Sequence, residues 1–238
     1  MKNLKNLLVL FMGIVTMSLT FASCNTDGED YSIDEVTQKR YQSLMSGSYS
    51  GKVLFQQFDS RQNKYVSVDS TNTTWYVRND STFSIRNFPI SKLDSAINVP
   101  SGDISSEGTQ LRALRKAISE LPDETIRCNY YVPNTQFVGT NGYQFLVNPL
   151  CTESDFPQLL ADKKPMFIKK KLTYNDETHD VYFVFYQNYY GGAYNSTSLL
   201  FNFYMMLAGI SIDTVPTQYT SSFSTQYFRN IAITCTKN

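Results

Sequence analysis

Short runs of alternating apolar and polar residues begin near Lys52 and recur along most of the chain. In the first half, four β-prone runs are separated by turn-forming residues: KVLFQQF, KYVSVD, TTWYVR and STFSIRNF. A period of two places alternate side chains on the same face of a strand. The four runs therefore predict an antiparallel meander with one face on a core.

Six more β-prone runs follow in the second half: RCNYYV, GYQFLV, MFIKKKLTY, DVYFVFYQN, STSLLFNFYMML and QYFRNIAITC. Turn-like segments such as GTNG and NDET join some of them. The run DVYFVFYQN is apolar on both faces, which predicts a central strand or one covered by a helix. In MFIKKKLTY, Lys170 falls on the face of Ile168 and Leu172, which is typical of an edge strand guarded against aggregation.

Three segments have helical spacing instead. The first begins at a capping box, Ser32-Ile33-Asp34-Glu35, and is predicted to end at Gly47. The second is a brief turn after Pro89. The third is the clearest helix and ends at Pro122, and its apolar residues share one face: Leu111, Leu114, Ile118 and Leu121. We expect this helix to pack on the sheet or to plug the end of a barrel.

These elements predict a mainly β protein of about ten strands with two or three short helices. An up-and-down antiparallel barrel and a two-sheet sandwich both close such a chain, and the sequence leaves the two open. No linker-like stretch interrupts residues 32–238, so we expect a single domain there.

The N-terminal segment has a different pattern. Lys2 and Lys5 precede an apolar run from Leu7 to about Leu19, shorter than the roughly 20 residues that a spanning helix needs. Residues 1–23 are therefore predicted to be a secretory signal. Phe21-Ala22-Ser23-Cys24 resembles a bacterial lipobox, although Phe21 stands where leucine is more usual. The resemblance implies that Cys24 carries fatty acyl chains such as palmitate. The alternative is an ordinary signal peptide cut near Ser23, which leaves a free Cys24.

An acidic stretch at residues 24–31 follows the lipobox and contains Asp27, Glu29 and Asp30. It resembles the export signal of Bacteroidetes-type lipoproteins, many of which reach the outer face of the outer membrane. The resemblance implies an outer-membrane lipoprotein that is surface-exposed, or otherwise faces the periplasm. A solvated, disordered tether explains the same residues, and both interpretations can hold together.

Net charge narrows the choice of partners. The chain has 21 Lys plus Arg and 21 Asp plus Glu, so the formal net charge is zero. Without a basic patch, neither nucleic acid nor an anionic membrane surface is an expected partner. Membrane contact is expected through the lipid on Cys24. The oligomeric state stays open.

If Cys24 is lipidated, three cysteines remain, so at most one disulfide can form within the chain. Cys128 and Cys235 share strand faces with apolar residues, and we interpret them as small buried hydrophobic residues. Whether Cys128, Cys151 and Cys235 pair is left open.

Local motifs for catalysis are missing from the sequence. Tyr49 stands where a Gly-x-Ser-x-Gly motif requires serine, and His179 is the sole histidine. One histidine and scattered cysteines do not make a zinc site, and no EF-hand or Gly-rich phosphate loop occurs. We therefore expect no cofactor, no metal and no catalytic residue that the sequence can identify. A carboxylate-dependent hydrolase stays open, because paired carboxylates meet only in the fold.

Aromatic residues are abundant, with 17 Tyr and 16 Phe. Tyrosine beside Asn or Gln suits glycan or polar peptide binding, since the ring covers apolar surface while the hydroxyl forms hydrogen bonds. The segment from Tyr186 to Ser198 concentrates these residues, and its Gly191 and Gly192 are interpreted as flexible joints. The candidate ligand-binding residues are Tyr189, Tyr190, Tyr194 and Asn195. The alternative is tyrosine acting as a β-former that covers sheet faces.

The opening SGSYSGKVLF resembles the start of lipocalin-like (calycin-like) domains. With the lipobox, the acidic stretch, the meander and the segment NFPI, the whole chain resembles a Bacteroidetes-type lipoprotein family of unknown function. This resemblance implies a location and a mostly β, lipocalin-like fold, and it transfers no catalytic residue. We expect a lipid-anchored cell-envelope protein that serves as a binding or accessory module for a glycan, peptide or small ligand. The alternatives are a carboxylate-dependent hydrolase and an envelope structural or assembly protein with no small ligand.

Overall fold

A computed structural model describes residues 33–59, 62–132, 138–139, 142–152, 167–186, 191–216 and 221–237. The predicted signal segment, Cys24 and the acidic stretch lie outside the described residues. Their interpretation therefore stays a prediction.

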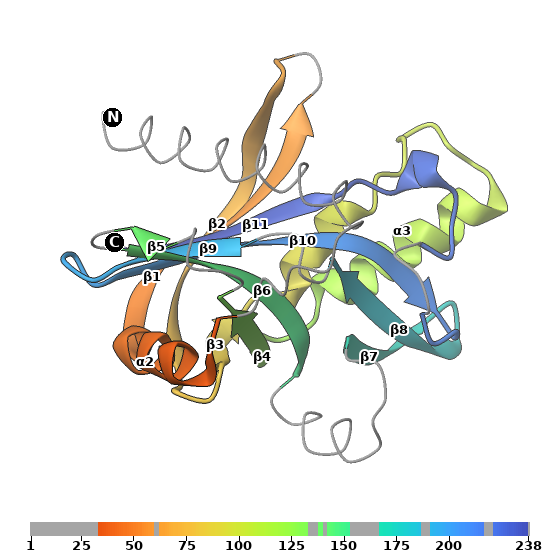
Figure 1. Ribbon diagram of the computed structural model, residues 1–238. Coiled ribbons are helices and arrows are strands. Elements are labelled where there is room, and N and C mark those ends of the chain that lie inside the picture. Colours follow the sequence, from red (N-terminus) through yellow and green to blue (C-terminus); the bar gives the residue numbers. More distant parts are fainter. Residues whose placement is uncertain are drawn as a thin grey trace, which may run out of the picture.

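Eight antiparallel strands close into a barrel (Figure 1). They are β1 (Gly47–Asp59), β2 (Lys64–Val77), β3 (Thr82–Phe88), β4 (Glu124–Tyr131), β6 (Gly142–Thr152), β9 (Gly191–Asn195), β10 (Leu200–Ile212) and β11 (Ile231–Lys237). The sheet runs β11-β1-β2-β3-β4-β6-β9-β10, and β10 then pairs back with β11. The mainly β prediction is confirmed, and the closure is a barrel rather than a sandwich.

Further strands extend this sheet. β8 (Glu177–Phe185) pairs with the second half of β10, β7 (Ile168–Tyr174) pairs with β8, and β5 (Val138–Gly139) pairs with β6. The predicted central strand is β8, whose residues 181–185 are all buried. The predicted edge strand is β7, which ends the sheet, and its Lys170 forms an ion pair with Glu124 at the start of β4. The turn between β7 and β8 has positive φ at Asn175 and Asp176, as a tight hairpin requires.

The predicted four-stranded meander is wrong by one strand. KYVSVD and TTWYVR belong to one continuous strand, β2, which pairs with β1 along its whole length. A β-bulge lies between the Phe55–Asp69 and Gln56–Ser67 pairs. It leaves Val68 without a partner residue on β1 and bends the strand. The turn-forming residues between the two runs stay extended because β1 supplies their backbone with hydrogen-bond partners.

Helical segments cover opposite ends of the barrel (Figure 1). The helix α2 (Glu35–Met45) packs at one end, where Tyr49 donates a 2.6 Å hydrogen bond to the Met45 carbonyl. Its N-cap is Asp34, which accepts from the Thr37 N–H, so the capping box predicted at Ser32 is wrong by two residues. At the other end lie η1 (Ile90–Ala96), α3 (Ser106–Ser119) and η3 (Thr225–Tyr227). The apolar face predicted for α3 is buried at Leu111, Leu114 and Ile118.

Aromatic side chains fill the barrel interior. Those that are essentially inaccessible to solvent are Trp75, Tyr130, Phe55, Phe83, Phe88, Phe145, Phe183, Phe201 and Phe203. Cys128 and Cys235 are also fully buried, which confirms their interpretation as small core residues. Burial raises the pKa of the Cys235 thiol well above its ordinary value. The side chain of Cys151 lies outside the described residues, so cysteine pairing stays open.

Candidate functional site

The residues predicted to bind a ligand occupy different environments. Tyr189 and Tyr190 lie outside the described residues. Tyr194 is only 3% exposed in β9, and its ring stacks parallel to that of Tyr143 at 5.9 Å between centroids. Asn195 is exposed, and its side-chain oxygen accepts hydrogen bonds from the backbone of the turn that follows β9. The structure places Tyr194 among core residues, and ligand contact by these four residues stays a prediction.

The two glycines of that segment are strand residues rather than flexible joints, and this part of the interpretation is wrong. A Cβ at Gly191 would lie 2.2 Å from the Phe145 carbonyl oxygen, and one at Gly192 would lie 2.3 Å from the Phe145 ring. Glycine is needed here because β9 lies unusually close to β6 and β10. Two adjacent glycines are also common in loops, so the sequence pattern did not distinguish the two cases.

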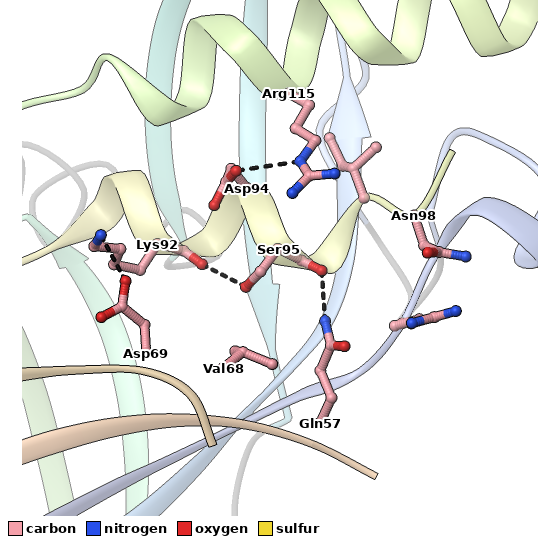
Figure 2. A pocket seen from close by; sticks show the side chains of 10 residues that line it. Gln57, Val68, Asp69, Lys92, Asp94, Ser95, Asn98 and Arg115 are labelled. Atoms are coloured by element: carbon pink, nitrogen blue, oxygen red, sulfur yellow. Dashed lines mark hydrogen bonds and ion pairs between the residues drawn. The ribbon is translucent and has the colours of Figure 1, made fainter. Parts of the chain in front are cut away.

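A polar cavity of about 440 Å³ lies where the β1–β2 hairpin meets the helical end of the barrel (Figure 2). The residues around it come from the hairpin, from η1 and the residues after it, from α3, and from the segment before β11. They are Gln57, Val68, Asp69, Lys92, Asp94, Ser95, Ile97, Asn98, Arg115 and Arg229. Figure 2 shows the Lys92–Asp69 pair and Asn98 toward opposite sides of the view.

Local structure explains why these segments meet. β3 pairs with β2 only between Thr74 and Val77, so the rest of the hairpin projects past β3, as Figure 1 shows. A hydrogen bond of 2.6 Å from the Gln57 amide to the Ser95 carbonyl joins the hairpin to η1. The bridge between Ile97 and Phe228 then brings the segment before β11 to the same place. Backbone hydrogen bonds on both sides of this bridge hold the segment there.

Two ion pairs join residues that line the cavity. Lys92 Nζ lies 2.6 Å from Asp69 Oδ2, and Arg115 Nε lies 3.2 Å from Asp94 Oδ2. The hydrogen bond from Lys92 lowers the pKa of the Asp69 carboxyl, and the same contact raises the pKa of Lys92. Lys92, Asp69 and Arg115 are more than a third exposed, so each pair contributes at most about 1 kcal/mol to stability. The pairs therefore orient the side chains more than they stabilise the fold.

Hydrogen-bond donors are left over in this cavity. Within the described residues, the side chains of Arg229 and Asn98 make no hydrogen bond or ion pair. Among the described residues that line the cavity, three cationic side chains face two carboxylates, so these residues carry an excess of one positive charge. An arrangement with spare N–H donors suits a ligand that carries acceptor oxygens.

The same carboxylates are poorly placed for hydrolysis. Glycoside hydrolysis by two carboxyl groups needs one of them protonated, with a raised pKa. The pKa of Asp69 is lowered, and Asp94 is also paired with a cation. A lowered pKa at Asp69 is the opposite of what a general acid needs.

Comparison with known protein families identifies the family of this chain. The sequence model of a domain of unknown function, DUF4840, matches residues 44–212, which is well over half of the chain. The chain belongs to the DUF4840 family. Neither the curated proteins nor the solved structures yielded a match. The resemblance to a family of unknown function with a barrel fold is thereby confirmed, whereas the Bacteroidetes lipoprotein type stays a prediction.

The DUF4840 match covers β1 to β10 and ends before β11. The strand that closes the barrel, and Arg229 in the cavity, therefore lie beyond it. Sequence reasoning missed the cavity because its residues have no common local pattern. The run QYFRNIAITC, for example, gave no sign that its arginine would face η1.

Other polar groups of this DUF4840 protein lie away from the cavity. His179 Nδ1 is 2.7 Å from Asp213 Oδ2, and its ring stacks on Tyr174 at 4.4 Å between centroids. Across the ranges described above, no three His, Cys, Asp or Glu side chains are grouped as metal ligands. In those same ranges, no helix has the length and apolar character needed to cross a membrane.

Proposed function

We propose that this DUF4840 protein is a lipid-anchored cell-envelope protein that binds a glycan, peptide or small polar ligand in the cavity beside η1. The observation that carries the proposal is the set of donors without partners, Arg229 and Asn98, at a cavity of about 440 Å³. This volume falls within the roughly 300–1,000 Å³ typical of small-molecule sites. The barrel interior offers less room, because aromatic side chains occupy it.

The envelope location rests on the N-terminal sequence. An apolar run, small residues and Cys24 followed by acidic residues support lipid attachment at the outer membrane, with the domain exposed at the surface or facing the periplasm. The test is metabolic labelling with an alkyne analogue of palmitate. We expect labelling of the wild-type chain and none of Cys24→Ala. Equal labelling of both would exclude Cys24 as the anchor.

Ligand binding is best tested by thermal unfolding of residues 25–238 with oligosaccharides, peptides and lipids. A ligand that binds only the folded state at about 100 times its Kd stabilises by about 2.7 kcal/mol. For a domain of about 200 residues, this raises Tm by roughly 5–11 °C. We expect such a rise with one ligand class.

Variants then locate the site. Asn98→Ala and Arg229→Ala should reduce the rise in Tm, because they remove the donors without protein partners. Arg86→Ala is the matched control, since Arg86 is an exposed arginine on β3 outside the cavity. An equal rise in all four proteins would place the ligand elsewhere. Flat curves across the whole panel would favour an envelope structural or assembly protein.

A further inference from the structure

We propose that the cavity is selective for acidic saccharides, with the sugar carboxylate bound by Arg229 and Asn98 and sugar hydroxyls bound by Asp69 and Asp94. The inference rests on the proposed function, because it names the ligand class of the same site.

The donor group suits a carboxylate. Arg229 presents a planar guanidinium whose N–H groups are uncommitted among the described residues, and such a group binds a carboxylate through two parallel hydrogen bonds. Asn98 and Arg229 follow the two ends of the Ile97–Phe228 bridge, so both are held by the same short backbone pairing. Arg115 uses Nε for Asp94, which leaves its terminal nitrogens available to the same ligand.

The acceptor group suits hydroxyls. Asp69 and Asp94 are oriented by their cation partners, and a carboxylate has more acceptor sites than one ion pair uses. Sugar hydroxyls donate to such oxygens. The two carboxylates also disfavour a ligand of high negative charge, because like charges repel at short range. The described lining residues have three cationic side chains and two carboxylates, so a ligand with a single carboxylate would balance the charge.

The composition of the wall favours a saccharide over an apolar peptide side chain. Among the described residues that line the cavity, only Val68 and Ile97 are apolar, and Ile97 is itself 1% exposed. An apolar side chain would displace water from charged groups without replacing their hydrogen bonds. A hydroxylated ring replaces those hydrogen bonds.

The test is isothermal titration of the purified full chain with galacturonic acid, which carries one carboxylate, and with its methyl ester. The two probes differ in charge and keep the same hydroxyls. We expect the acid to bind roughly tenfold tighter than the ester, since a charged partner strengthens a hydrogen bond. The preference should shrink at high ionic strength, because the cavity is open to solvent and salt screens its charges.

Arg229→Ala should weaken binding of the acid much more than binding of the ester and so remove most of the preference for the acid. Arg229→Lys should keep part of the preference, because lysine retains the charge without the planar pair of donors. Arg86→Ala should behave as wild type. A wild-type Tm in each variant, without ligand, shows that the variant is folded.

Several results would overturn the inference. If wild type binds acid and ester equally, or if Arg229→Ala weakens both equally, then Arg229 does not recognise the carboxylate, while cavity binding itself stands. If neither saccharide binds but another ligand raises Tm and loses that effect in Asn98→Ala, the ligand class is wrong and the proposed function stands. Absence of any ligand in both experiments removes both proposals.

Discussion

Replacing Phe201 by alanine tests whether the barrel interior is a packed core or a space for a ligand. Phe201 is fully buried on β10 at the centre of the aromatic cluster. Its ring centroid lies between 4.5 and 6.1 Å from those of five other rings, those of Tyr49, Phe83, Tyr130, Phe145 and Phe203. These separations are within the range of favourable aromatic pairs.

The expected loss follows from the packing. A buried Phe→Ala change costs about 3–5 kcal/mol through lost transfer free energy and the cavity left behind. Each aromatic pair adds roughly 0.5–1.5 kcal/mol beyond area burial, which places Phe201→Ala in the upper part of that range, at about 4–5 kcal/mol. With a urea m-value of about 2–3 kcal/mol/M, the midpoint should fall by about 1.3–2.5 M.

Urea unfolding followed by tyrosine and tryptophan fluorescence measures the midpoint and the m-value. Phe201→Leu is the control, because leucine leaves a smaller cavity than alanine and should therefore cost clearly less stability. A loss of stability in Phe201→Ala no greater than in Phe201→Leu, at an unchanged m-value, would contradict a tightly packed interior. Such a result would mean that the interior has room to spare and would reopen it as a ligand site.

Three further predictions concern the scaffold. Gly191→Ala should lower Tm by several degrees, because the new Cβ would overlap the Phe145 backbone. Gly102→Ala is the control and should leave Tm nearly unchanged, because the space around Gly102 is open. Equal shifts of Tm in the two variants would contradict this prediction. Hydrogen bonds from Ser105 and Tyr227 hold the pKa of Asp103 at about 2, below its ordinary 3.8. Its carboxylate therefore stabilises the fold fully above pH 3.8 and loses this effect as pH falls toward about 2. Wild type should unfold at a higher urea concentration than Asp103→Asn above pH 3.8, and this difference in midpoint should disappear as pH falls toward about 2. A gap that persists at the lowest pH would refute the role of ionisation. Ending the chain before β11 should abolish cooperative unfolding measured by circular dichroism, because β1 and β10 lose the strand that joins them. A truncated chain that still unfolds in a sharp transition would contradict this prediction.

Local sequence patterns located most elements of the fold. The period of two found the strands that have one face on the core, and the spacing of Leu111, Leu114 and Ile118 found α3. The pattern failed at β2, where turn-forming residues lie within a strand, because pairing with β1 outweighs their local preference. It failed again at β9, where Gly191 and Gly192 serve close strand packing rather than a turn.

The candidate cavity could not be predicted in this way. Gln57, Asp94, Arg115 and Arg229 belong to four segments far apart in the chain, and each is unremarkable among its sequence neighbours. No local spacing relates them, because they meet only through the bridge at Ile97 and the packing of η1 on the hairpin.

The sequence by itself determined the type of most elements and the mainly β class, and it predicts a lipid anchor at Cys24. These follow from the period of apolar residues and from short contiguous motifs, which act over a few residues. Only the tertiary structure decided that the sheet closes as a barrel, that Tyr194 lies in the core and that Arg229 faces a polar cavity. Each of these depends on contacts between distant segments, whose free energy is set by how side chains fit together rather than by their order along the chain.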